Sequence, residues 1–94
     1  MRVATLYRRY RLRQQELSRS TDPFDRFHAA VATLVSELNA DAEGLDAAER
    51  RALCRDLGAQ LEHDLQAAED DRRRDVTMAL LKAVEDIEHR HRLR

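Results

Sequence analysis

The side chains of this 94-residue chain that could do chemistry are one cysteine, four histidines and 18 carboxylates. Cys54 would act as a nucleophile only with a base beside it, because the thiolate is the reactive form. His63 comes nine residues later in the same predicted helix, and at about 100° per residue it lies on the opposite face. We therefore interpret Cys54 as a buried packing residue.

Two pairs of potential metal ligands stand three residues apart near the end of the chain, Asp86 with His89 and Glu88 with His91. This spacing allows one helix to supply two ligands to a metal site in a helical bundle. A di-metal site would also need glutamates that face inward from other helices, whereas Glu88 is placed near the solvent side and His91 in the last helical turn. We interpret the basic residues that end the chain as balancing the negative end of the last helix.

Other signatures of catalysis are missing from the sequence. It has no glycine-rich phosphate loop, no G-x-S-x-G motif and no cysteine or histidine cluster at zinc-finger spacing. Carboxylate pairs carry no signal, because 18 acids on a helical surface form many pairs by chance. His28 is expected at the edge of an apolar stripe, half-buried and without a functional role. We predict that the protein is not an enzyme and uses no cofactor and no metal.

The composition indicates which elements must position these side chains. Alanine, leucine, arginine, lysine and glutamate make up 52 of the 94 residues, and there are two glycines and one proline. Such a composition is typical of long helices and argues against sheets. Leucine, isoleucine, valine and phenylalanine together number only 21. We predict an all-α fold in a single domain, residues 1–94, as a bundle of three to four amphipathic helices whose thin core is completed by dimerisation.

Two apolar stripes at helical spacing mark the first half of the chain. The first helix is predicted over residues 3–17. The second is predicted over about residues 23–40, with Asp22 as N-cap, Pro23 in the first turn and Asp25 near the positive helix end. The two stripes consist of Val3, Tyr7, Tyr10, Gln14 and Leu17, and of Phe24, Phe27, Val31, Leu34 and Leu38.

The second half of the chain holds one long apolar pattern that begins at a predicted capping box, Asp46 with Glu49. Its stripe is Leu53, Leu57, Leu61, Leu65 and Ala68, followed by Val76, Leu80, Ala83, Val84 and Ile87. Acids at residues 69–71 would sit badly at the negative end of a helix, whereas Asp71 or Asp75 could cap a new one. We therefore predict a break between two helices. The alternative is one continuous rod over residues 46–93, which would force dimerisation.

The formal net charge is only −1, but the charged residues are distributed unevenly along the chain. Residues 1–20 carry six arginines and one glutamate, whereas residues 21–89 carry eight basic and seventeen acidic groups. The arginines of the first helix are not balanced within that helix, since Glu16 is its only acid. They therefore need partners elsewhere.

Three partners remain open for this basic helix. It could lie on the acidic body of its own chain or of a second copy. It could bind nucleic acid, with arginines on phosphates and the tyrosines stacked on bases. It could also bind an acidic protein or an anionic membrane surface, although Leu12 on its polar side fits a membrane poorly. The residues predicted to contact a partner are Tyr7, Arg8, Arg9, Tyr10 and Arg13, because aromatic side chains and arginine contribute strongly to interfaces.

These observations together predict a small, non-enzymatic protein–protein interaction module that acts as an adaptor, regulator or inhibitor. A nucleic-acid-binding regulator that uses the basic first helix is the alternative. We expect the first helix, residues 1–19, to be detachable from a helical core at residues 23–93, and the protein to be a homodimer. One unpaired cysteine and the lack of an apolar leader or membrane span indicate a cytoplasmic location. Sixteen arginines against one lysine suggest GC-rich codons and a bacterial or phage source.

Overall fold

A computed structural model of the chain describes residues 2–92, and these form four α-helices and no strand. The helices are α1 (Arg2–Ser18), α2 (Phe24–Glu43), α3 (Ala47–Ala67) and α4 (Asp71–Arg92). The predicted all-α class is confirmed, and α2 runs three residues further than expected. Residues 1, 93 and 94, at which the predicted domain and its last helix end, lie outside the described residues.

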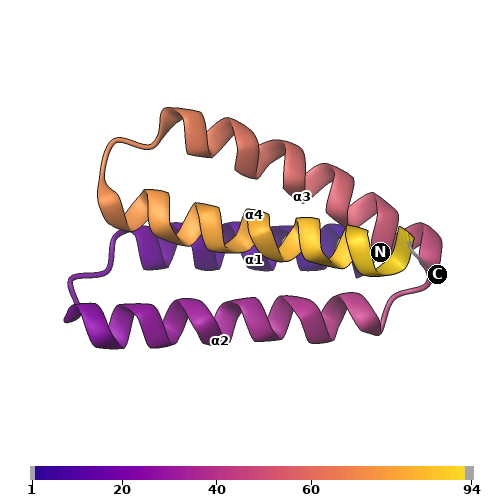
Figure 1. The fold of residues 1–94 in the computed structure, drawn as a ribbon, viewed down its shortest axis with the longest axis horizontal. Coiled ribbons are helices and arrows are strands. Elements are labelled where there is room, and N and C mark those ends of the chain that lie inside the picture. Colours follow the sequence, from indigo (N-terminus) through magenta and orange to yellow (C-terminus); the bar gives the residue numbers. More distant parts are fainter. Residues whose placement is uncertain (1, 93–94) are drawn as a thin grey trace.

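The four helices run alternately in opposite directions and form a bundle 38 Å long and 26 by 24 Å across (Figure 1). The first and last helices, α1 and α4, pack against each other in the middle. Helix α2 lies along one side of this pair and α3 along the other (Figure 1). Both α1 and α4 therefore contact all three other helices, so the basic first helix is an integral wall of the bundle.

One hydrophobic core runs through the bundle and takes side chains from all four helices. Helix α1 contributes Val3, Leu6 and Tyr10 to this core, and Tyr10 is fully buried. The predicted stripes of the other helices are largely confirmed, since the following residues are buried: Phe27, Val31, Leu34, Leu38, Leu53, Leu57, Leu61, Val76, Leu80, Val84 and Ile87. A single chain thus closes one continuous core, and dimerisation stays a prediction.

The start of α3 follows the sequence prediction and the start of α2 does not. The Asp46 side chain accepts a hydrogen bond from the Glu49 backbone N–H at 2.8 Å, and the Glu49 carboxylate accepts one from the Asp46 N–H at 3.3 Å. The predicted Asp22 N-cap is wrong. Pro23 takes the cap position with ψ of 150°, and no side chain of residues 2–92 caps the start of α2. The extended backbone of Pro23 keeps it outside the helix, so α2 begins one residue later.

The predicted break between α3 and α4 is confirmed, but its cap is a different residue. Asp70 accepts a hydrogen bond from the Arg73 backbone N–H at 2.8 Å. The predicted caps, Asp71 and Asp75, both lie inside α4, which begins at Asp71. A capping side chain must stand just before the first helical residue, and Asp70 alone of the three does so. Asp71 pairs instead with Arg74 at 3.2 Å.

Phe24 is half-exposed at 52%, which corrects its predicted place in the core. It is the first residue of α2, three positions before the buried Phe27, and the Arg72 guanidinium lies 5.3 Å from its ring. The same guanidinium lies 4.9 Å from the Phe27 ring and donates a hydrogen bond to the Ser20 carbonyl at 3.1 Å. His28 packs against Phe24 with ring centroids 4.9 Å apart, and it is more exposed than the half-buried position expected.

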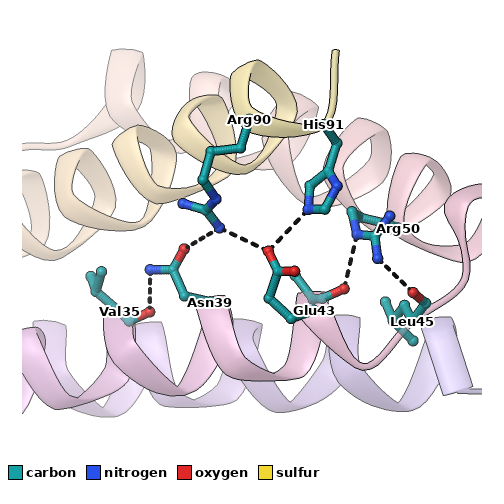
Figure 2. A network of polar contacts seen from close by, with 8 residues as sticks. Val35, Asn39, Glu43, Leu45, Arg50, Arg90 and His91 are labelled. Carbon is teal, nitrogen blue, oxygen red and sulfur yellow. Dashed lines mark hydrogen bonds and ion pairs between the residues drawn. The ribbon is translucent and has the colours of Figure 1, made fainter. Parts of the chain in front are cut away.

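The opposite end of the bundle is closed by a polar network around Glu43, the last residue of α2 (Figure 2). Its carboxylate lies 2.9 Å from His91 Nε2 and 3.2 Å from Arg90 Nη2, both on α4. These hydrogen bonds, from His91 and then Arg90, lower the pKa of Glu43 and outweigh the opposing effect of desolvation. Arg50 of α3 donates to the carbonyls of Ala42 and Leu45 beside it. The network joins the ends of three helices.

Candidate binding groove between α1 and α3

The five α1 residues predicted to contact a partner fall into two groups on the folded bundle. Arg9, Tyr10 and Arg13 interact with α2. Arg9 Nη1 lies 3.3 Å from Asp41 Oδ2, and Arg13 Nη1 lies 3.7 Å from Glu37 Oε2. These two arginines therefore already have acidic partners within the chain.

Tyr10 belongs to the core and not to the surface. It is 0% exposed, and its hydroxyl donates a hydrogen bond to Asp41 Oδ2 at 2.6 Å. Burial and the hydrogen bond to Asp41 both raise the pKa of Tyr10 well above its usual value. A ring in this position cannot stack on a nucleic-acid base while the bundle stays folded.

A polar network between α1, α3 and α4 was not foreseen from the sequence. Arg11 forms an ion pair with Asp64. Gln14, only 3% exposed, donates through Nε2 to Asp64 at 3.0 Å and to the buried Thr77 hydroxyl at 3.1 Å. Burial alone would raise the pKa of Asp64, but hydrogen bonds from Gln60 and Arg11, helped by the Arg11 charge, outweigh it and lower that pKa.

The position of Gln14 in the sequence is the one signal that indicates this polar network. Gln14 stands on the apolar stripe of the first helix, and a polar side chain that the pattern points inward must find polar partners there. The identity of those partners, Asp64 and Thr77, depends on how the helices are rotated against one another. The spacing within each helix does not reveal that rotation.

Tyr7 and Arg8, the second group, line an open groove between α1 and α3 of about 730 Å³. Val3 and Ala4 complete its α1 wall, and the α3 wall consists of Arg55, Asp56, Ala59 and Gln60. The groove ends along α1 at the Arg11–Asp64 ion pair, beyond which a smaller polar hollow of about 100 Å³ reaches Ser18 and Arg73.

The groove exists because small side chains stand where two parallel helices meet. Ala4 and Ala59 face it with a single methyl group each, and Tyr7 is half-buried beside them. Arg8 is exposed, and among residues 2–92 it makes no ion pair. The predicted residues Tyr7 and Arg8 thus lie at the same groove. The sequence alone does not reveal that these two residues lie opposite α3.

The cysteine and two of the histidines considered above lie in different surroundings on the folded bundle. Cys54 is buried at 4% exposure, and burial, with the Glu88 charge as a smaller cause, raises the pKa of its thiol to about 11. His63 is exposed. Within residues 2–92 no group of three potential ligands could hold a metal ion, and His91 contacts Glu43 instead.

No helix within residues 2–92 is both long enough and apolar enough to cross a membrane. The chain is an all-α four-helix bundle with a groove on the α1–α3 side. No family model matches it, and neither the curated proteins nor the solved structures contain a relative that matches.

Proposed function

We propose that this bundle is a non-enzymatic protein–protein interaction module, an adaptor, regulator or inhibitor, that binds its partner in the α1–α3 groove. The observation that carries the proposal is the groove itself, an open depression of about 730 Å³ lined by Tyr7 and Arg8. Tyr7 is an aromatic residue, and Arg8 is an arginine that makes no ion pair within residues 2–92. Aromatic side chains and arginine contribute strongly at interfaces. A single free thiol is compatible with a reducing compartment such as the cytoplasm.

The alternative, binding of nucleic acid, has less support from the same helix. Arg9, Arg11 and Arg13 each pair with an acid of the chain itself. Releasing them for phosphates would leave those acids facing the polyanion. Tyr10 is buried, so only Tyr7 of the two tyrosines is placed near a surface that could stack on a base.

The test compares partner capture by the wild-type protein with capture by Ala59→Gln, in extracts of the organism that encodes it. The longer side chain occupies the groove and should remove the captured partner without unfolding α3. Ala32→Gln is the matched control, because Ala32 is an exposed alanine on α2, on the other side of the α1–α4 pair. Equal capture by wild type and Ala59→Gln would refute the groove as the binding site.

The same groove could instead join two copies of this chain. The two variants also test this homodimer. If two copies associate through the groove, the mass of the protein measured by sedimentation should fall from dimer to monomer in Ala59→Gln and stay dimeric in Ala32→Gln. Binding to duplex DNA or single-stranded RNA at 50 mM salt, with an affinity that falls steeply as salt rises, would favour the nucleic-acid alternative instead.

A further inference from the structure

We propose that the α1–α3 groove accepts an amphipathic helix of the partner whose apolar stripe is flanked by aspartate or glutamate on both sides. This inference rests on the proposed function and adds the chemistry of the partner. It follows from three features of the groove, namely its apolar floor, its length and the charge of its two rims.

The floor of the groove is apolar and leaves room for a helix. Tyr7 is half-buried and Ala4 and Ala59 are exposed, so these three offer apolar surface at the opening, and Val3 lies buried beneath them at 6% exposure. Ala4 and Ala59 stand on the two walls and project no atom beyond Cβ. Small residues on both walls allow the backbone of a third helix to approach, as in close helix packing elsewhere. Burial of apolar side chains in this floor would supply the binding energy.

The length of the groove matches about one and a half turns of a helix. Its lining residues span positions 3–8 of α1 and 55–60 of α3, which is about 8 Å of helix axis at 1.5 Å per residue. The Arg11–Asp64 ion pair closes one end. A helix that lies along the groove would place two apolar residues in it, three or four positions apart, because that spacing keeps side chains on one face.

The rims carry the charge that selects the partner. Arg8 stands on the α1 rim without an ion pair among the described residues, and the Arg55 side chain on the α3 rim is 71% exposed. Arg55 Nε lies 3.0 Å from the neighbouring Asp56 carboxylate, but an exposed pair of this kind is weak. Two arginines against one aspartate leave the opening positive. Acids on both flanks of a bound helix would meet Arg8 and Arg55, whereas lysines there would be repelled.

A displayed library of helical peptides tests this chemistry directly. Each peptide carries two leucines four residues apart on an alanine-rich helix, and the four flanking positions vary among aspartate, glutamate, lysine and serine. Selection on the wild-type protein should enrich acids on both flanks of the leucines. Enrichment of lysine or serine, or no enrichment, would overturn the inference.

Charge reversal then checks where the selected peptide binds. Arg8→Glu should weaken binding of the synthetic acidic peptide by about three- to tenfold, because an exposed attraction becomes a repulsion of similar size. The same variant should strengthen binding of the peptide with lysine flanks. Arg26→Glu is the matched control, since Arg26 is an exposed arginine on α2, and it should leave both affinities unchanged. Circular dichroism confirms that each variant stays helical.

The two tests fail in different ways. Loss of native partner capture in Ala59→Gln, together with selected peptides that lack acidic flanks, would keep the groove as a binding site and refute the acidic helix. Equal binding of the acidic peptide to wild type and Arg8→Glu would also refute it. Equal capture of the native partner by wild type and Ala59→Gln would refute the proposed function, whatever peptide is selected.

Discussion

The hydrogen bond from Gln14 of α1 to Thr77 of α4 crosses the middle of the bundle, and its removal tests how the two central helices are held together. Gln14 is 3% exposed and Thr77 is 0% exposed. Thr77→Val preserves the shape of the side chain but leaves one amide N–H of Gln14 without an acceptor. A buried polar group without a partner costs about 1–3 kcal/mol. We expect Thr77→Val to lower the free energy of unfolding by about 2 kcal/mol.

The reciprocal change, Gln14→Leu, should cost a similar amount. It removes a donor to Asp64 and leaves the Thr77 hydroxyl to bond within its own helix. The double variant removes both partners and buries apolar groups in their place. Its loss should therefore fall short of the combined single losses by about 1.5 kcal/mol, since no unpaired amide remains.

Urea unfolding followed by the helical signal in circular dichroism measures all four proteins of this cycle. The slope of free energy against urea should stay constant, so that the midpoints report stability alone. If the two single losses add to within about 0.5 kcal/mol in the double variant, the side chains do not interact. That outcome would refute the hydrogen bond as a contribution to the placement of α1.

Three further predictions concern the stability of single residues. Gly58→Ala should stabilise the protein by about 0.5–1 kcal/mol, because alanine has the higher helix propensity. The added methyl group has room, since its nearest neighbour is Val84 Cγ1 at 3.4 Å. A lower thermal midpoint would show that this contact is too tight. Cys54, whose thiol pKa is raised to about 11, should react with a thiol reagent at pH 8 only as fast as the protein opens, so labelling at the rate of a free thiol would contradict its burial. The pKa of Asp64 is lowered on folding, so its stabilising effect is complete above the unfolded value of about 3.9 and is lost as pH falls through the folded value. Asp64→Asn should therefore destabilise the protein at pH 7 and much less near pH 2, and an equal loss at both pH values in urea unfolding would refute the assignment.

The helices of this bundle could be predicted because their signals are local. The spacing of Phe27, Val31 and Leu34 marks one face of a helix whatever that face packs against. The Asp46–Glu49 capping box is equally local, since both hydrogen bonds form within one turn. The cap of α4 was harder to predict because three aspartates stood within six residues, and only the exact start of the helix selects Asp70.

Features that depend on how helices meet could not be predicted from spacing. Phe24 continues the apolar stripe of α2, but the core ends at Phe27 and leaves Phe24 52% exposed. Tyr7 and Arg8 were predicted to face a partner, yet their position opposite Ala59 depends on the rotation of α1 against α3. The same rotation decides that Arg9 meets an acid of α2 while Arg8 meets none within residues 2–92.

The start of α1 and the end of α4 meet at the same end of the bundle, beside the last turn of α2 (Figure 1). Arg2 donates to the Gly44 carbonyl there at 3.2 Å, and Arg90 bonds to Glu43. Because the start of α1 and the end of α4 lie together, a linker could join these two helices and the chain could be reopened in the connection between α1 and α2. Such a circular permutant would make the basic helix the last to leave the ribosome while preserving every contact of the groove. Order along the chain and position in the bundle are thus separable in this architecture.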